Sequence, residues 1–205
     1  MEVLQNISYK LNEIFYSIQT EGFHSGMPAV FLRMSGCNMA CQFCDTDKSD
    51  KLTLDTKDII THISSLSQTC KNIIITGGEP TLQRLKTLIT ELKKYGYYIC
   101  IETNGTNSFG MGKVDWITLS PKILTTRPIF YNEVKFVFGV FDMYDVENWV
   151  NNYCYAVNRF SEYQKPVHRY LQPMYGKNEK ETIEYVKMNP RWHLSVQWHK
   201  MIGMQ

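Results

Sequence analysis

Short strand-like segments alternate with helical patterns along most of this chain. β-Branched and aromatic residues are concentrated in short runs, and such runs predict strands. The runs span 29–35, 72–76, 97–103, 115–120, 133–138, 168–172 and 193–197. Apolar residues at helical spacing predict helices over 56–68, 81–96, 142–150 and 178–188. Strands that alternate with helices favour a parallel sheet covered by helices.

The segment between the third and fourth predicted strands departs from this alternation. Residues 104–114, NGTNSFGMGKV, are few for a helical crossover between parallel strands. We therefore predict an α/β fold, an incomplete, helix-poor (β/α) barrel of about six parallel strands. A full barrel of this kind has roughly 250 residues, and this chain has 205. Because no linker or repeat is visible, we expect one domain over residues 1–205.

The composition argues against nucleic acid and membranes as binding partners. The formal net charge is +2, which is too small to argue for binding to nucleic acid or to an anionic membrane. No apolar run approaches the roughly 20 residues of a membrane helix. The first residues, MEVLQNISYKLNEIF, lack the basic start and apolar core of a signal peptide. We expect a cytoplasmic protein that binds neither nucleic acid nor membrane.

Three of the six cysteines lie within eight positions, at Cys37, Cys41 and Cys44. A structural zinc site normally needs four protein ligands, and no paired ligand motif follows these cysteines. A redox pair of Cys41 and Cys44 would leave Cys37 unexplained. An iron–sulfur cluster held by three cysteines leaves one iron open to a small molecule, which suits this spacing best. The isolated Cys70, Cys100 and Cys154 are interpreted as small buried hydrophobic residues.

The pattern Cys37-x3-Cys41-x2-Cys44, with Phe43 before the last cysteine, resembles the signature of the radical S-adenosylmethionine (SAM) superfamily. The segment TGGEP at 76–80 follows the second predicted strand, where that superfamily has a GGE-type motif. The resemblance implies that the three cysteines hold a [4Fe–4S] cluster whose open iron is chelated by SAM. Glycines at 77 and 78 would allow the backbone to approach a ligand closely.

A narrower resemblance covers most of the chain. FYSIQTEGFHSGMPAVFLRMSGCNMACQFCDTD at 15–47 is similar to the start of the 7-carboxy-7-deazaguanine synthase family. ETNGT, LSPK, EVKFVF, LQPMYG and SVQWHK follow in that family's order and spacing. The resemblance implies a carbon–nitrogen lyase that converts 6-carboxy-5,6,7,8-tetrahydropterin into 7-carboxy-7-deazaguanine with loss of ammonia, in queuosine (7-deazapurine) synthesis. A 5′-deoxyadenosyl radical would take hydrogen from C6, Mg²⁺ would assist, and SAM would be regenerated.

The same resemblance implies roles for individual residues. Thr46 would be a Mg²⁺ ligand, and an arginine fork at Arg33 would suit the substrate carboxylate. The residues expected near SAM are Phe43, Gly77, Gly78, Glu79, Thr103, Ser120, Lys122 and Gln172, with Glu102 and Asn104 as further candidates that could instead shape the turn. The residues expected at the pterin are Gln19, Glu21, Gly22, Arg33, Gly78, His199 and Gln205.

The C-terminal tail and the partners are further expectations from the resemblance. We expect the terminal carboxylate of Gln205 to fold back over the pterin. The family implies a flavodoxin or ferredoxin as electron donor and a homodimer. Position 20 is threonine here, whereas glycine is frequent in the family, and we expect this change to be tolerated.

Two alternative functions remain open from the sequence. The first is a radical SAM activase that installs a glycyl radical on a partner enzyme, since such activases are small and share the cysteine spacing. The second is a non-enzymatic zinc or iron–sulfur binding module. SIQTEG and VQWHK count against the first alternative, and GGEP with the strand pattern counts against the second.

Overall fold

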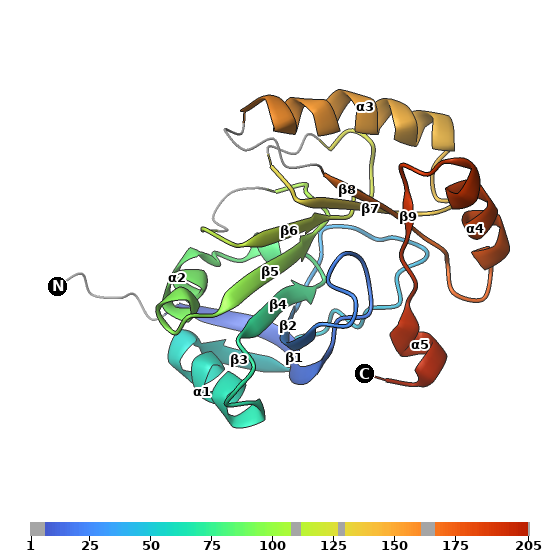
Figure 1. Cartoon of the computed structure of the whole chain (residues 1–205). Coiled ribbons are helices and arrows are strands. Elements are labelled where there is room, and N and C mark those ends of the chain that lie inside the picture. The colour runs from blue at the N-terminus through green and yellow to red at the C-terminus, as the bar shows by residue number, and fades with distance from the viewer. Residues whose placement is uncertain (1–6, 108–111, 127–129, 161–166, 205) are drawn as a thin grey trace. The chain divides into compact units, whose positions relative to one another are not determined.

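The computed structural model describes residues 7–107, 112–126, 130–160 and 167–204. The chain divides into two compact units, which Figure 1 shows with their helices and strands labelled. Unit 1 contains Met1–Ile18, Pro28–Thr103 and Asn107–Trp116. Unit 2 contains Gln19–Met27, Asn104–Thr106 and Ile117–Gln205. The expectation of one domain stays a prediction.

Unit 1 is built on five strands in the order β3-β1-β2-β4-β5. The bounds are Ser8–Ile18 for β1, Pro28–Met34 for β2, Leu52–Asp55 for β3, Asn72–Gly77 for β4 and Tyr98–Thr103 for β5. β2, β4 and β5 are parallel, whereas β1 is antiparallel to both β2 and β3. The register places Met34 beside Gly77, so the carboxyl ends of β2 and β4 meet at one edge.

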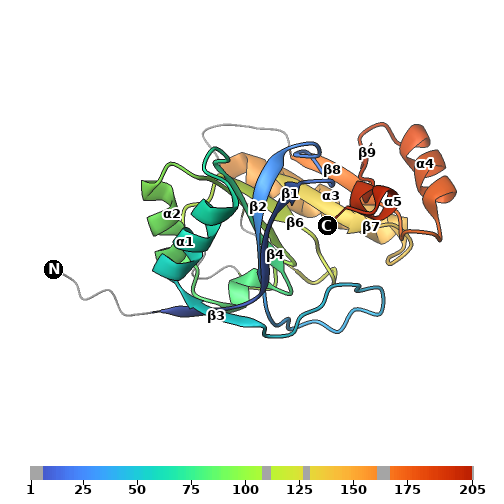
Figure 2. The same ribbon diagram turned by 90° about the horizontal axis from the view of Figure 1, so that it is seen from below.

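Helices α1, Thr56–Leu66, and α2, Lys86–Lys94, lie on the same side of the unit 1 sheet (Figure 2). Asp55 caps α1 by accepting from the amide of Asp58 at 2.9 Å, and the helix buries its own Ile59 and Ile63 side chains. The expected continuous helix over 81–96 is wrong at its start. A 3-10 turn, η1, occupies Pro80–Leu82 and is followed by extended backbone at Gln83.

The interruption is explained by a hydrogen-bonding partner that is distant in the sequence. The side-chain amide of Gln83 donates to the carbonyl of Lys10 at 2.8 Å and accepts from its amide at 2.9 Å. Gln83 thereby supplies β1 with two hydrogen bonds of the kind that a neighbouring strand would provide. A local helical pattern cannot reveal this bond, because its partner lies 73 residues away.

Unit 2 contains four parallel strands in the order β6-β7-β8-β9. They are β6, Trp116–Leu119, of which Ile117–Leu119 belong to this unit, β7, Glu133–Val137, β8, His168–Gln172, and β9, His193–Leu194. The helices are α3, Met143–Phe160, α4, Glu179–Met188, and α5, Trp198–Ile202. All seven predicted strands are thus present, although β9 covers only the first two residues of the strand predicted over 193–197. β1, β3 and α5 were not predicted.

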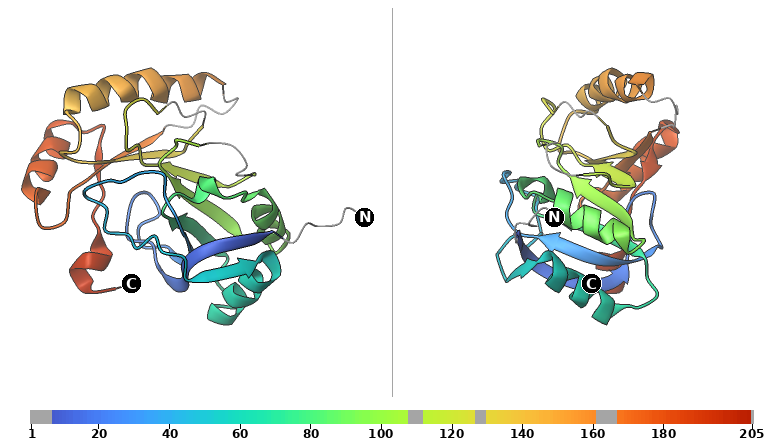
Figure 3. Two further views of the ribbon diagram at one scale, coloured as in Figure 1. Left: turned by 180° about the vertical axis from the view of Figure 1, so that it is seen from behind. Right: turned by 90° about the vertical axis from the view of Figure 1, so that its left-hand side faces the viewer.

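Helix α3 packs over the strands of unit 2, as Figure 3 shows with α3 in yellow to orange. The core between them is aromatic. The ring of Phe136 on β7 meets Trp149 of α3 edge-on at 5.5 Å and Trp192 at 6.2 Å. All three side chains are at most 4% exposed. No helix among the described residues is long and apolar enough to cross a bilayer.

Candidate functional site

The three clustered cysteines lie in unit 1 on the loop that joins β2 to β3. Cys37 and Cys41 are half-buried, Cys44 is exposed, and all three are free thiols. The loop has no helix or strand of its own and is anchored at its ends. Gly36 donates its amide to the carbonyl of Lys48 at 3.0 Å, and the hydroxyl of Ser35 donates to the carbonyl of Ser49 at 3.0 Å.

The donor chemistry of this loop fits an iron–sulfur cluster. Three reduced, accessible thiols on one short segment are the ligand type that such clusters use. Within the described residues, no three His, Cys, Asp or Glu side chains already converge on a metal position. Because metal binding commonly organises its own ligands, we expect the cluster to draw these thiols together.

The GGE turn packs directly against this loop. Gly78 donates its amide to the carbonyl of Met34 at 3.0 Å, and Glu79 donates to the carbonyl of Gly36 at 2.8 Å. A Cβ at Gly78 would overlap the carbonyl oxygen of Gly36, and one at Gly77 would overlap the backbone of Met34. The two glycines therefore allow close approach between backbone segments of the fold itself.

Glu79 is completely buried and is held by threonines. Its Oε1 accepts from the amide of Thr81 at 3.0 Å, from the hydroxyl of Thr81, and from the hydroxyl of Thr103 at 2.7 Å. The first of these bonds caps η1. Glu79 and Thr103, both predicted to lie near SAM, thus meet in one buried network that ties the ends of β4 and β5.

Arg33 contacts two side chains of the neighbouring strand β1. Its Nε donates to Oε1 of Glu13 on the neighbouring strand at 2.6 Å, and its guanidinium lies 5.5 Å from the ring centre of Phe15. Both partners belong to β1, which was not predicted. The two Nη groups are further donors of the guanidinium fork.

The remaining candidates lie on the cysteine loop, on β5 and the turn after it, and in unit 2. Phe43 and Thr46 lie half-buried on the cysteine loop, and Glu102 is half-buried on β5. Asn104 accepts from the amide of Thr106 at 2.9 Å and from its hydroxyl at 2.7 Å, which is a turn-forming role. In unit 2, Lys122 donates to the hydroxyl of Ser120 at 2.8 Å.

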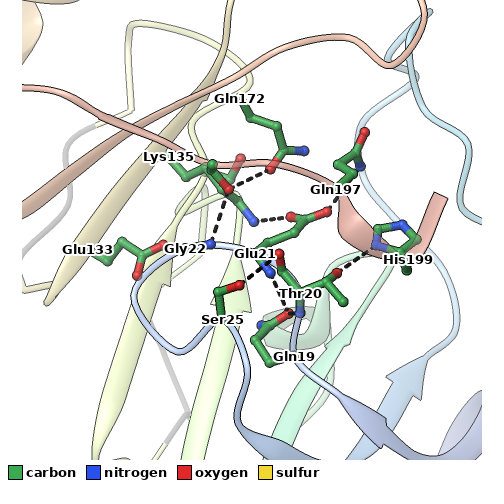
Figure 4. Close-up of polar contacts among 12 residues, drawn as sticks. Gln19, Thr20, Glu21, Gly22, Ser25, Glu133, Lys135, Gln172, Gln197 and His199 are labelled. Carbon is green, nitrogen blue, oxygen red and sulfur yellow. Dashed lines mark hydrogen bonds and ion pairs between the residues drawn. The ribbon is translucent and has the colours of Figure 1, made fainter. Parts of the chain in front are cut away.

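Four of the predicted pterin residues lie together in unit 2 (Figure 4): Gln19, Glu21, Gly22 and His199. Oε2 of Glu21 pairs with Nζ of Lys135, and Oε1 accepts from the side-chain amide of Gln197 at 3.0 Å. Burial alone would raise the pKa of Glu21, but the charge and hydrogen bond of Lys135, the bond from Gln197 and the charge of His199 lower it. The site therefore holds an ionised carboxylate.

The other residues of the loop 19–27 hold its shape. Oε1 of Gln19 accepts from the amides of Thr20 at 2.9 Å and Glu21 at 3.3 Å. Gly22, at φ +65°, donates its amide to Oγ of Ser195 at 3.1 Å, and a Cβ there would overlap the Glu133 carboxylate. Ser195 donates in turn to Oε1 of Gln172 at 3.2 Å.

His199 joins the same cluster from α5. Its Nδ1 lies 2.7 Å from the hydroxyl oxygen of Thr20. The expectation for Gln205 falls outside the described residues. Gln19, Glu21, Gly22, Gln172 and His199 are thus linked in one network of unit 2, whereas Arg33 and Gly78 belong to unit 1.

Comparison with known proteins adds an independent line of evidence. Residues 31–188 match the Radical SAM superfamily. The 7-carboxy-7-deazaguanine synthase of Bacteroides thetaiotaomicron is 38% identical over 96% of this chain and 98% of its own length. The chain belongs to this synthase family of the radical SAM superfamily.

Other members of the 7-carboxy-7-deazaguanine synthase family are also similar to this chain over nearly its whole length. The synthase of Neisseria meningitidis serogroup B is 35% identical over 98% of this chain and 96% of its own. The synthase of Haemophilus influenzae is 32% identical over 97% of this chain and 95% of its own length. The crystal structure of QueE from Escherichia coli superposes with a TM-score of 0.73 at 28% identity, covering 93% of this chain and 94% of that one.

Membership of the family confirms the predicted fold class, a helix-poor α/β fold of the radical SAM type with a mostly parallel sheet. It also favours an iron–sulfur cluster with SAM over the zinc and redox-pair interpretations of the cysteines. The assignments of individual residues stay predictions.

Several polar residues of the unit 2 network were missed by the sequence analysis. They are Thr20, Glu133, Lys135, Ser195 and Gln197. One signal was available for two of them. Glu133 and Lys135 alternate within EVKFV, and charged residues in a strand that is otherwise apolar are rarely buried without partners.

Proposed function

We propose that this protein is a 7-carboxy-7-deazaguanine synthase, which converts 6-carboxy-5,6,7,8-tetrahydropterin into 7-carboxy-7-deazaguanine with loss of ammonia. One observation carries the proposal. Three free thiols at the radical SAM spacing lie on a loop hydrogen-bonded to the GGE turn, in a chain that matches such synthases along 96% of its length.

Cys37, Cys41 and Cys44 would each ligate one iron of a [4Fe–4S] cluster. When bound, the cluster and SAM supply the carbon-centred radical that takes hydrogen from C6 of the pterin. Gly77, Gly78 and Glu79 would lie along the methionine part of SAM. Thr46 offers a hydroxyl oxygen, the hard ligand type that Mg²⁺ prefers together with water.

Glu21 is the residue that we assign to the amino-pyrimidinone edge of the pterin. Its carboxylate is ionised and accepts hydrogen bonds, which matches the ring N–H and amino donors of that edge. The bond from Gln197 is the contact that the pterin would replace, because Lys135 must remain to balance the buried charge. Gln19, Gly22 and His199 would complete the substrate side.

Arg33 is assigned to the substrate carboxylate. Glu13 occupies its Nε, and the two Nη groups can pair with a carboxylate. The ion pair with Glu13 would hold the guanidinium plane in position for this role.

The protein also needs a source of single electrons for its cluster. We propose a flavodoxin or ferredoxin as donor, a homodimeric assembly and a cytoplasmic setting. The terminal carboxylate of Gln205 is proposed as a further substrate contact, and a C-terminal extension of several residues that left turnover intact would count against it.

The decisive experiment is an anaerobic assay. The protein is reconstituted with iron and sulfide, reduced, and supplied with SAM, Mg²⁺ and 6-carboxytetrahydropterin, and 7-carboxy-7-deazaguanine is sought by mass spectrometry. We expect product from the native protein and none from Cys41→Ala. SAM cleavage without any deazaguanine would overturn the substrate assignment and leave a different radical SAM reaction, such as that of an activase.

A further inference from the structure

A contact between Thr20 and His199 connects two segments of unit 2 that are far apart in the sequence. The Thr20 side chain belongs to the loop 19–27 and His199 to the first turn of α5. Their contact, Oγ1 to Nδ1 at 2.7 Å, spans 179 residues of sequence. Thr20 is 7% exposed, so its hydroxyl needs a partner inside the protein.

The chemistry of the two groups limits how they bond. A neutral imidazole carries a proton on one nitrogen and accepts at the other. The hydroxyl proton of Thr20 is satisfied only if it is donated, and among the described residues Nδ1 of His199 lies within hydrogen-bonding distance. Donation to Nδ1 leaves the imidazole proton on Nε2.

The other contacts of α5 explain why this bond affects the orientation of the His199 ring. α5 has five residues and none of them is buried, and helices this short are not stable by themselves. Side chains of the loop hold its start instead, through Glu21 with Gln197 and Thr20 with His199. The bond from Thr20 therefore helps to orient the ring of His199.

We propose that Thr20 is a positioning residue that fixes the neutral form of His199 in the Nε2–H tautomer, so that this form presents Nε2–H as a hydrogen-bond donor to a carbonyl or carboxylate oxygen of the substrate. This inference rests on the proposed function for the identity of the substrate. The tautomer itself is independent of any activity.

The test combines two variants with a matched control. Thr20→Val removes the hydroxyl and keeps the shape of the side chain, and Thr20→Ser keeps the hydroxyl. Ser25→Ala removes another hydroxyl of the same loop, one that donates to the carbonyl of Thr20 at 3.2 Å and does not contact His199. The His199 signals are assigned by their loss in His199→Gln.

Imidazole ¹⁵N spectra of the full-length, reconstituted protein, recorded above pH 7.5, report the tautomer directly. We expect Nδ1 to resonate as an unprotonated nitrogen in the native protein, Thr20→Ser and Ser25→Ala, and as a mixture of tautomers in Thr20→Val. A protonated Nδ1 in the neutral form of the native protein would overturn the proposal, and this outcome does not depend on how the Thr20 variants fold.

Kinetics supply the second measurement. The loss of one net hydrogen bond corresponds to about a 3- to 10-fold effect, and we expect Thr20→Val to raise KM for 6-carboxytetrahydropterin by that factor, with Thr20→Ser close to native. A Thr20→Val protein with the native tautomer or an unchanged KM would refute the positioning role. If the native protein made no deazaguanine, the proposed function would fail while the spectra still decided the tautomer.

Discussion

Glu21 and Lys135 form an ion pair whose side chains are only 14% and 7% exposed. The pair connects the loop 19–27 to β7 within unit 2. Removing charges from water is costly, and their attraction offsets that cost only when the remaining hydrogen-bonding sites are also satisfied. Gln197 satisfies the second carboxylate oxygen. The pair is thus a structural support as well as a candidate substrate contact.

Lys135→Met leaves the Glu21 carboxylate without its counter-charge. We expect a loss of about 3–5 kcal/mol in the free energy of unfolding at pH 7, measured by urea denaturation. Burial then raises the pKa of Glu21, so the loss should shrink as the pH is lowered. The control is Lys187→Met, which removes an exposed pair with Glu184 and should change stability little. Equal losses in both variants would contradict the role of burial.

Gly78→Ala tests the close contact between the GGE turn and the cysteine loop. The added methyl group would overlap the Gly36 carbonyl oxygen and lie 3.2 Å from Cβ of Cys37. Because backbone must move, we expect a loss of about 3 kcal/mol, measured by thermal or urea unfolding. Gly96→Ala is the comparison, since Gly96 has φ +76° but no atom within 4 Å of the added Cβ. It should cost about 1–2 kcal/mol, and a smaller loss at Gly78 than at Gly96 would refute the steric explanation.

Substitution of any one clustered cysteine should disrupt the cluster. We expect Cys37→Ala, Cys41→Ala and Cys44→Ala each to lose most of the bound iron and the visible absorbance after anaerobic reconstitution. Cys70→Ala is the matched control, because Cys70 is buried and contacts the carbonyl of Pro28 at 3.4 Å. Native iron content in Cys44→Ala, or its loss in Cys70→Ala, would argue against the three-cysteine assignment.

His24 and His168 predict a dependence of stability on pH. The two lie against Phe23, and burial together with a neighbouring imidazole lowers the pKa of each, His168 acting on His24 and His193 on His168. The unfolded chain, with an ordinary histidine pKa of about 6.5, binds protons more readily than the folded one. The stability that these groups contribute is therefore present above that value and is lost as the pH falls below it.

The measurement is the unfolding midpoint between pH 5.5 and 7.5. We expect His168→Gln to flatten the curve, because one of the two depressed groups is gone and the other loses its charged neighbour. The comparison variant is His62→Gln, on α1. A His168→Gln curve as steep as the native one would show that the slope comes from other groups, such as the Glu133 carboxylate opposite His168 on β7.

The parallel strands and the cysteine loop could be predicted because their signals are local. A run such as NIIIT at 72–76 or EVKFVF at 133–138 carries its strand preference within a few residues. The spacing of Cys37, Cys41 and Cys44 is likewise complete within one short segment. The motifs also sufficed to indicate the family, which the comparisons then showed.

The tertiary structure decided what depends on distant partners. β1 mixes polar and apolar residues and becomes a strand through pairing with both β2 and β3. Gln83 breaks a helical pattern because it bonds to Lys10. Thr20, which the sequence marked only as a tolerated departure from a frequent glycine, contacts His199, 179 residues further along the chain. Burial and charge pairing arise only when such segments meet, so the state of Glu21 and the orientation of His199 belong to the fold, whereas the cysteine spacing belongs to the sequence.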